Sequence, residues 1–421
     1  MATLSILGAG REVGRSSFLL DATDKVLLDR GVKIMPDTIE YPLPLNTNIN
    51  AAIISHAHLD HSGNLPHLFL RSTFLTFLTQ PTLDLSKMLW FDALKIAGLE
   101  GMVPEFTEDE IALTEKFAFP VRYKSGLDIT ENIYAEFFDA GHILGSMLTK
   151  LHFENKTLLY TGDFNPSETR LFKGADLNVG KVDIVVIEGT YGDRDHPPRR
   201  ETEKIFYETV EETIAKGGIA LVPAFAVARS QELVEVLAEY NVSAEIYLDG
   251  MAQKASRIFM DYPSYLKTPK KLKKALKKAI WIKNSRMRKK IVKKPCVIIT
   301  TSGMLQGGPV QHYLKHIYKD KNSSILLTGY QVEGTPGRIL LETGKIQIED
   351  GFVDVEATVR KFDFSAHASQ SDMLYALKKW SPERVIIVHA DSDVADIFKD
   401  RIKEEIGIDA TIAENGMEIE L

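Results

Sequence analysis

Three histidines and an aspartate occur within six residues, in the segment His-Ala-His-Leu-Asp-His that runs from His56 to His61. The segment directly follows the apolar run 51–54, which predicts a buried strand. Imidazole nitrogens and carboxylate oxygens are common ligands of zinc and related cations. In an extended or tightly turned segment, His56 and His58 point the same way, whereas Asp60 and His61 lie past the turn. The spacing predicts two metal ions, and because the chain has only 11 histidines, chance clustering on an exposed turn is the weaker alternative.

Further candidate ligands follow other predicted strands. His142 lies in a glycine-flanked loop after the strand 134–138, and Asp163 follows the strand 158–160. Asp29 ends the predicted strand 25–28, where it either forms an ordinary turn or holds the metal loop through hydrogen bonds. Each signal alone is weak, because a loop histidine is more often structural and a carboxylate after a strand is a common turn former. Their order after the histidine cluster strengthens the prediction.

Length and composition limit the class of protein. A chain of 421 residues with 44% hydrophobic content predicts two well-packed globular domains. No apolar run approaches the roughly 18 residues of a membrane span, and the N-terminal residues do not resemble a signal peptide. The single cysteine, Cys296, allows neither an intramolecular disulfide nor a cysteine-based zinc knuckle. We expect a cytoplasmic protein.

The middle of the chain has a different pattern. Between Glu188 and His367, segments of helical periodicity alternate with short apolar runs such as 219–222, 245–248, 297–300 and 325–328. Helices that alternate with buried strands predict a parallel sheet covered on both faces. This region is therefore expected to form a second α/β unit.

Basic residues are concentrated in one part of this region. The net charge of the chain is −7, yet the segment from Lys267 to Lys294 contains 14 Lys or Arg and no Asp or Glu. Leu272, Leu276 and Ile280 fall at helical spacing on one face. The opposite face carries lysines, among them Lys270, Lys273, Lys274 and Lys277. Such a face is either simply solvated or a contact for RNA, and a local positive block on an acidic chain favours RNA.

The motifs, in their order along the chain, resemble a known family. The succession of Asp29, the histidine cluster, His142 and Asp163 is similar to the metallo-beta-lactamase superfamily. Glu188 in Val-Ile-Glu-Gly-Thr-Tyr-Gly, His367 in Phe-Ser-Ala-His-Ala and His389 in Ile-Ile-Val-His-Ala-Asp resemble the three motifs of the beta-CASP nucleases. This group includes the endonuclease subunit of the cleavage and polyadenylation specificity factor, its archaeal homologues and ribonuclease J. Because the lactamase pattern begins at residue 3, the chain looks like a short archaeal form without KH domains.

The resemblance implies a fold and its boundaries. Residues 1–192 and 362–421 are expected to form an αβ/βα sandwich of the metallo-beta-lactamase type. Residues 193–361 are expected to form an inserted α/β beta-CASP domain. The chain departs from the family pattern in Ala390-Asp391, where relatives commonly have Gly-Glu, and in Ser369, where an aspartate is common. These departures leave the ligand set complete.

The resemblance also implies roles for individual residues. His56, His58 and His142 would hold one zinc ion. Asp60, His61 and His389 would hold the second, with Asp163 bridging both. Asp29 would support the ligands through hydrogen bonds. The catalytic residues would be Asp60, Asp163, His367 as the general acid and Glu188 as the group that orients it.

These residues together predict a ribonuclease with two zinc ions that cuts single-stranded RNA internally and leaves a 5′-phosphate and a 3′-hydroxyl. It would act either as a homodimer or in an RNA-processing complex, and away from membranes. The alternatives are a 5′-to-3′ exoribonuclease like ribonuclease J, a lactamase-fold hydrolase of another substrate, and an inactive scaffold. The basic insert argues against a small-molecule hydrolase, and the complete ligand set argues against a scaffold.

Overall fold

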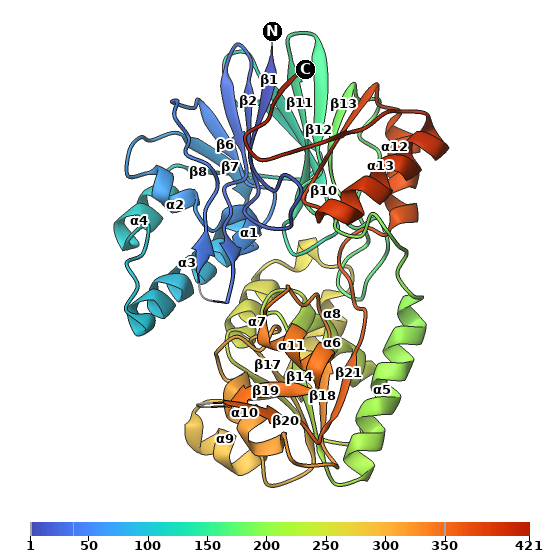
Figure 1. The fold of residues 1–421 in the computed structure, drawn as a ribbon. Helices are drawn as coiled ribbons and strands as arrows, with labels where there is room; N and C mark the ends of the chain where they lie inside the picture. The colour runs from blue at the N-terminus through green and yellow to red at the C-terminus, as the bar shows by residue number, and fades with distance from the viewer. Residues whose placement is uncertain (1, 37, 349–350) are drawn as a thin grey trace. The chain divides into compact units, whose positions relative to one another are not determined.

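The computed structural model describes residues 2–36, 38–348 and 351–421. The chain divides into two compact units (Figure 1). Unit 1 comprises residues 1–168, 173–195 and 366–421, and unit 2 comprises residues 169–172 and 196–365. The predicted insert was 193–361, and the corresponding part of unit 2 is 196–365. Unit 2 also includes the short segment 169–172, which was not predicted.

The first sheet of unit 1 contains the predicted strands 25–28 and 51–54, as β3 and β6. Here β1 (Thr3–Gly8), β2 (Ser17–Asp21) and β3 (Lys25–Leu28) pair antiparallel, and β3, β6 (Ala51–Ile53), β7 (Leu75–Thr79) and β8 (Ala118–Val121) then pair in parallel. In order across the sheet, the strands are β24 (Glu418–Glu420), β1 (Thr3–Gly8), β2 (Ser17–Asp21), β3 (Lys25–Leu28), β6 (Ala51–Ile53), β7 (Leu75–Thr79) and β8 (Ala118–Val121). The β6 strand delivers the histidine segment at its carboxyl end.

The second sheet of unit 1 carries the other predicted ligands. In order, its strands are β23 (Thr411–Ile412), β22 (Arg384–Val388), β13 (Ile184–Glu188), β12 (Lys156–Tyr160), β11 (Met147–Phe153), β10 (Tyr134–Asp139) and β9 (Ser125–Asp128). The neighbours β12, β13, β22 and β23 run parallel. The carboxyl ends of these strands therefore meet at one edge of the sheet.

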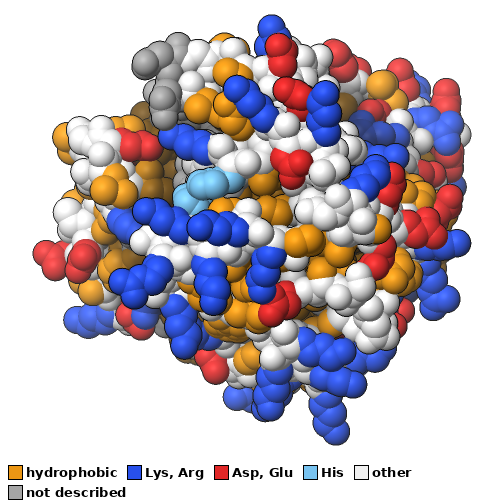
Figure 2. Space-filling view, turned by 90° about the horizontal axis from the view of Figure 1, so that it is seen from below, with side chains coloured by type: hydrophobic (Ala, Val, Ile, Leu, Met, Phe, Trp, Pro, Cys, Tyr) orange, Lys and Arg blue, Asp and Glu red, His pale blue; other side chains and the backbone are white. Residues whose placement is uncertain are grey.

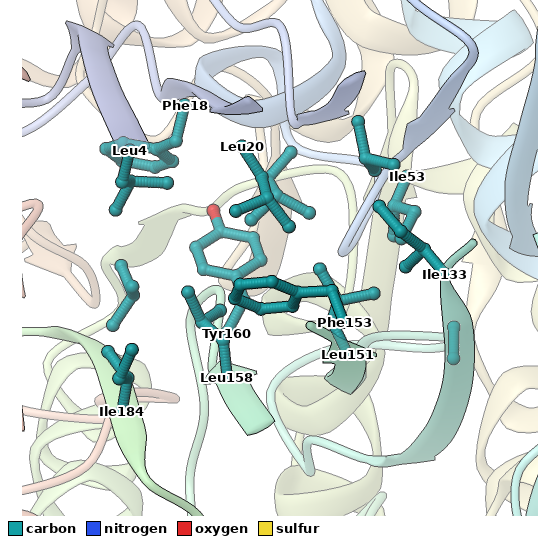
Figure 3. Close-up of a cluster of buried hydrophobic side chains, with 14 of the residues drawn as sticks. Leu4, Phe18, Leu20, Ile53, Ile133, Leu151, Phe153, Leu158, Tyr160 and Ile184 are labelled. Atoms are coloured by element: carbon teal, nitrogen blue, oxygen red, sulfur yellow. The ribbon is translucent and has the colours of Figure 1, made fainter. Parts of the chain in front are cut away.

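The two sheets pack face to face around an apolar core. Leu4, Phe18 and Ile53 of the first sheet meet Leu151 and Tyr160 of the second (Figure 3). Because side chains alternate along a strand, the residues between them point to the outer faces and need helices to cover them.

Helices cover both outer faces. On the first sheet, Trp90 of α3 (Gln80–Glu100) and Ile111 of α4 (Glu108–Lys116) pack over the strands. On the second, Trp380 of α12 (Gln370–Trp380) and Phe398 of α13 (Ser392–Ile406) do the same. The order helix, sheet, sheet, helix confirms the predicted αβ/βα sandwich. The remaining elements of unit 1 are α1 (Leu59–Ser62), α2 (Leu65–Leu68), β4 (Lys33–Ile34) and β5 (Ile39–Glu40).

Unit 2 is built on one parallel sheet, as predicted. In order, its strands are β16 (Ile280–Trp281), β15 (Ile246–Asp249), β17 (Cys296–Thr300), β14 (Ile219–Pro223), β18 (Ser324–Leu327) and β21 (Thr358–Lys361). Each neighbouring pair is parallel. The other elements are α5 (Arg199–Ala215), α6 (Arg229–Glu239), α7 (Ala252–Asp261), η1 (Pro263–Tyr265), α8 (Pro269–Lys278), α9 (Ser285–Ile291), α10 (Val310–Ile317), α11 (Pro336–Thr343), β19 (Lys345–Ile348) and β20 (Gly351–Asp354).

The helices of unit 2 are shared between the two faces of this sheet. Apolar side chains of α9, α10 and α11, such as Ile291, Tyr313 and Leu340, form one core with the strands. Helices α5, α6 and α7 contact β14, β17 and β15, and α8 packs on α6 and α7. Among the described residues, no side chain of α5 to α8 belongs to the core that α9, α10 and α11 form with the strands. Helices α5 to α8 therefore cover the other face of the sheet.

The basic segment 267–294 is consequently divided between the two faces of the sheet. Its predicted helical stripe is also shorter than expected, because α8 ends at Lys278 and Ile280 begins β16. Strand pairing between Ile280 and Tyr247 overrides the helical spacing there. In the described part of the chain, no helix combines the length and the apolar character that crossing a bilayer requires.

Candidate metal centre

The histidine segment changes from extended to helical at its midpoint. His56 lies shortly after the end of β6, and His58 is the N-cap of α1, with φ −56° and ψ 146°. Asp60 and His61 lie within α1, so the helical turn directs their side chains away from those of His56 and His58. A short helix thus takes the place of the predicted tight turn and divides the donors into two groups. His56 and His61 are fully buried.

Other strand ends bring the remaining donors to the same place. His142 lies in the loop between β10 and β11, Asp163 follows β12, and His389 follows β22. Two groups of donor atoms result, in each of which the atoms lie within 4.8 Å of one another. The first group is His56, His58, His142 and Asp163, and the second is Asp60, His61, Asp163 and His389.

Ring nitrogens converge in the first group. Nε2 of His56 lies 3.2 Å from Nδ1 of His58, and Nε2 of His142 lies 3.1 Å from the same nitrogen. Oδ2 of Asp163 lies 3.5 Å from Nε2 of His56 and 3.6 Å from Nε2 of His142. Three imidazoles and one carboxylate therefore point at a common centre.

The second group uses the other oxygen of the same aspartate. Oδ1 of Asp163 lies 3.3 Å from Nε2 of His61 and 3.4 Å from Nδ1 of His389. Nε2 of His389 lies 3.4 Å from Oδ2 of Asp60. Although Asp163 is buried, its Oδ1 has no hydrogen-bond geometry to any partner in the described residues. A buried carboxylate oxygen in that condition is costly unless a cation compensates it.

The protonation states of the first group suit metal binding. Burial, together with the neighbouring histidines, holds the pKa values of His56 and His142 well below the ordinary value. Burial lowers the pKa of His58 to about 4. Neutral imidazole is the form that coordinates a metal. At neutral pH the first group therefore presents three unprotonated nitrogens.

The second group has the opposite balance. Burial opposes protonation of His61, but the charges of Asp163 and Asp29 outweigh it and raise the pKa of His61 well above its usual value. Burial likewise opposes ionisation of Asp163, but His61 and His389 hold its pKa well below the usual range. His61 therefore carries a proton at neutral pH, which a metal ion must displace in order to bind.

Asp29 supports the histidine segment through four hydrogen bonds. Ser55 donates to its two oxygens from the backbone nitrogen and from the hydroxyl, each at 2.7 Å. Nδ1 of His61 lies 2.7 Å from Oδ2, and the hydroxyl of Tyr160 donates to the same oxygen at 2.6 Å. Asp29 thus has the position expected of a residue that supports the metal ligands. Because it bonds Nδ1 of His61, the other ring nitrogen, Nε2, faces Asp163.

Sequence reasoning missed several of the supporting groups. Ser55 and Tyr160 are two of them, and both donate hydrogen bonds to Asp29. The carbonyl oxygen of Ala366 lies 2.9 Å from Nδ1 of His142. Oγ1 of Thr190 lies 3.2 Å from Nδ1 of His389. A hydroxyl or carbonyl next to a ligand has no distinctive spacing. Only Thr190, within the motif of Glu188, carried a signal in the sequence.

Ser369, one of the departures from the family pattern, caps a helix. Its hydroxyl accepts a hydrogen bond from the backbone nitrogen of Asp372 at 3.2 Å at the start of α12. Aspartate and serine are equally good N-caps, so this position tolerates either residue.

His367 forms a pair with Glu188 beside the two groups. Nδ1 of His367 lies 2.9 Å from Oε2 and 3.2 Å from Oε1 of Glu188, which is the last residue of β13. Burial opposes protonation of His367, but the charges of Glu188 and Asp163 outweigh it and raise the pKa to about 9. The side chain of His367 is 20% exposed, so a proton on this ring can reach a substrate.

The predicted RNA-binding lysines lie in unit 2, whereas every predicted metal ligand lies in unit 1. Lys270, Lys273, Lys274 and Lys277 are exposed on α8. The basic segment does have acidic partners from other elements, contrary to the premise drawn from its own sequence. Lys271 pairs with Glu239, Arg288 with Asp249, and Lys294 with Glu245.

The sandwich fold and the two donor groups at its edge define a metallo-hydrolase of the metallo-beta-lactamase type. Family models match the chain as a Beta-Casp domain at residues 230–340 and as a Zn-dependent metallo-hydrolase RNA specificity domain at 353–413. A third model, the anti-Pycsar protein Apyc1, matches residues 4–182.

Curated relatives extend over nearly the whole chain. A probable RNase MJ4 of Methanocaldococcus jannaschii is 39% identical over 98% of this chain and 99% of its own length. RNase aCSPSF2 of Saccharolobus solfataricus is 36% identical over 99% of this chain and 85% of its own length. Transcription termination factor FttA of Thermococcus kodakarensis is 35% identical, covering 98% and 70% respectively.

This chain therefore belongs to the beta-CASP ribonucleases of the metallo-beta-lactamase superfamily. A crystal structure of a protein of unknown function from Enterococcus faecalis V583 is similar with a TM-score of 0.62 at 13% identity, and it covers 100% of both chains. At that identity the likeness concerns the fold alone.

Proposed function

We propose that this protein is a two-zinc endoribonuclease that hydrolyses single-stranded RNA to products with a 5′-phosphate and a 3′-hydroxyl. The observation that carries the proposal is the position of Asp163. Its two carboxylate oxygens face two separate groups of histidine and aspartate donors, and the His367–Glu188 pair lies beside them.

The donor set fits two cations. His56, His58 and His142 would hold one, Asp60, His61 and His389 the other, and Asp163 would bridge them. Five imidazoles, two carboxylates and no thiolate favour zinc over magnesium. The buried Oδ1 of Asp163, which lacks a hydrogen bond in the described residues, is satisfied once a cation is bound. When bound, two such cations supply the Lewis acidity that activates water and neutralises phosphate charge.

The chain's own residues provide the proton for the leaving group. Glu188 accepts from Nδ1 of His367 and holds the ring, which leaves Nε2 as the nitrogen that donates a proton to the departing ribose 3′-oxygen. The raised pKa keeps this ring protonated at neutral pH. The backbone nitrogen of Phe164 donates to Oε1 of Glu188 at 2.9 Å, so the carboxylate itself is held in place.

RNA as the substrate is supported by the relatives. The Methanocaldococcus jannaschii and Saccharolobus solfataricus proteins are named as RNases, and the model that matches residues 353–413 is named for RNA specificity. The complete donor set supports an active enzyme, as opposed to a scaffold. A further relative, from Methanocaldococcus jannaschii and 36% identical over 93% of this chain, is named RNase J-like protein, which makes a 5′-to-3′ exoribonuclease the second candidate.

A covalently closed circular RNA separates the two modes of cleavage, because it has no end for an exonuclease to bind. We expect the purified protein, loaded with zinc, to cut a single-stranded circle and to produce first a linear molecule of full length. Asp163→Ala, prepared in parallel, serves as the control for contaminating nucleases. Intact circles beside rapid degradation of a linear 5′-monophosphorylated RNA of the same sequence would favour the exonuclease.

A further inference from the structure

A second group of basic residues lies on the face of the unit 2 sheet opposite to α8. It comes from α9 and the turn after it, and from α10 and the turn after it. The exposed members are Arg286, Lys289, Lys290, Lys293, Lys315, His316 and Lys319. We call these seven residues the α9–α10 face.

The two helices that carry this face are tied together from beneath. Asp249, at the end of β15, is buried. Nε and Nη2 of Arg288 donate to its two oxygens at 2.7 and 3.0 Å, and the hydroxyl of Tyr313 donates to Oδ2 at 2.7 Å. Because Arg288 belongs to α9 and Tyr313 to α10, one carboxylate fixes both helices. The backbone positions from which the exposed cations extend are therefore fixed relative to one another.

The charge on this face is concentrated. His312 of α10 is partly buried, and its ring centroid lies 4.5 Å from that of the exposed His316 on the same helix. Seen from below, the molecule shows Lys and Arg side chains gathered around a hollow that contains histidine (Figure 2).

Helix stability explains only part of this arrangement. Lys289 and Lys290 lie in the last turn of α9, where cations interact favourably with the helix dipole. Arg286 lies in the first turn, where the dipole disfavours a cation, and Lys293 and Lys319 lie beyond the helices. The helix dipole therefore does not account for these three cations, of which Lys319 lies over the ring of Tyr318.

The composition of the face indicates the kind of partner. Interfaces between proteins are depleted in lysine and have an apolar centre. No large hydrophobic side chain of α9 or α10 is among the exposed ones in the described residues. Among the described residues, no Phe, Tyr or Trp of these two helices is exposed as a platform on which bases of single-stranded RNA could stack. Cations alone recognise the phosphate backbone and not the bases.

We propose that the α9–α10 face binds the phosphate backbone of RNA, independently of sequence, through residues that take no part in the metal centre. The identity of the polyanion as RNA rests on the proposed function. The face would add affinity for long substrates, whereas a substrate of a few nucleotides that occupies the metal centre alone would gain nothing from it.

Charge reversal on α9 tests this proposal. The variant carries Arg286→Glu, Lys289→Glu, Lys290→Glu and Lys293→Glu. The control carries Lys95→Glu, Lys181→Glu, Lys378→Glu and Lys403→Glu, four exposed lysines of unit 1, so that both proteins change net charge equally. A third protein carries Lys270→Glu, Lys273→Glu, Lys274→Glu and Lys277→Glu on α8. Binding of a zinc-loaded protein to a 30-nucleotide phosphorothioate RNA of mixed sequence, which is cut slowly, is measured by fluorescence anisotropy between 50 and 300 mM salt.

We expect the α9 variant to bind RNA at least tenfold more weakly than the control. The slope of log binding constant against log salt concentration should become less steep by up to about 3, because each phosphate contact on a single strand contributes roughly 0.7 to that slope. Its rate of cleavage of a six-nucleotide RNA should equal that of the control. Circular dichroism of each variant verifies that it is folded.

Two results would overturn the proposal. The first is an α9 variant with the affinity and salt slope of the control, whatever the α8 variant shows. The second is wild-type protein that binds polyglutamate of equal length as tightly as RNA, which would identify an acidic protein as the partner. Failure of the proposed function is distinguishable, because it would appear as wild-type protein that does not cleave the six-nucleotide RNA.

Discussion

Nδ1 of His367 lies 2.9 Å from Oε2 of Glu188, although the two residues are 179 positions apart in the chain. The carboxylate is buried at the end of a central strand, and the imidazole is partly exposed beside the metal ligands. A buried anion behind a partly exposed ring is an arrangement that keeps the ring protonated and aims its other nitrogen outward. This is the arrangement that the proposed general acid requires.

Loss of the imidazole should slow the chemical step without loss of metal. We expect His367→Ala to keep its zinc and its affinity for RNA and to cut RNA at least about 100-fold more slowly, the scale of losing a general acid. A substrate with a better leaving group should recover much of the rate. Equal defects on both substrates would assign His367 a different role.

The pH dependence of cleavage should report the same pair. A general acid works while protonated, so activity is present below the pKa of His367 and is lost above it. Glu188 is the charge that most raises this pKa. Glu188→Gln should therefore shift the alkaline limb of the kcat profile to lower pH than in the wild-type protein. An unchanged alkaline limb would contradict the assignment.

Asp163 should be required for both metal ions. Asp163→Ala removes the oxygens that face the two donor groups, so we expect loss of RNA hydrolysis and a fall in bound zinc by elemental analysis. Cys296→Ala is the matched control, because this thiol is equally buried but lies in β17 of unit 2. Unchanged zinc in Asp163→Ala would disprove the bridging role.

Gly31 should be needed for the position of the second donor group. A Cβ added at Gly31 would lie 1.8 Å from the carbonyl oxygen of Asp60 and 2.6 Å from the nitrogen of His61. Gly31→Ala must therefore displace the backbone of two ligands, and we expect reduced zinc content and at least tenfold slower cleavage of RNA. Gly98→Ala, in α3, meets nothing within 4 Å and should leave both unchanged. Full zinc content and rate in Gly31→Ala would show that the loop adapts.

Glu235 of α6 should make unit 2 less stable as the pH rises. Burial raises its pKa to about 7. The folded state then binds a proton at Glu235 more tightly than the unfolded state does. The stability that this protonated side chain contributes is therefore fully present below about pH 4.5 and is lost as the pH rises through 7. Gln does not titrate, so the wild type should lose stability relative to Glu235→Gln as the pH rises. The difference in unfolding free energy between the two proteins should change by about 1–3 kcal/mol in favour of the variant from pH 5 to pH 8, measured by denaturant unfolding.

Glu239, one turn later on the same helix, gives the control of opposite sign. Burial opposes its ionisation, but Arg170 and Lys271 lower its pKa, so its contribution is present at neutral pH and is lost on acidification. Glu239→Gln should lose stability at pH 8 relative to the wild type. The same pH trend in both variants would contradict the assignment to burial of Glu235.

Local spacing in the sequence determined strands such as 25–28, 219–222 and 297–300, the histidine segment and its division into two pairs of donors. The periodicity of side chains is a property of a short segment, and a sandwich with a parallel-sheet insert followed from it and from the family motifs. Tertiary structure decided which strand ends meet. Asp163 and His389 converge because sheet pairing places β12, β13 and β22 side by side, and His142 joins them from the loop between the neighbouring strands β10 and β11. The basic segment, continuous in sequence, is divided between two faces because Ile280 pairs as a strand between α8 and α9. Strand order and the face that a helix covers depend on contacts between distant segments, which no local pattern contains.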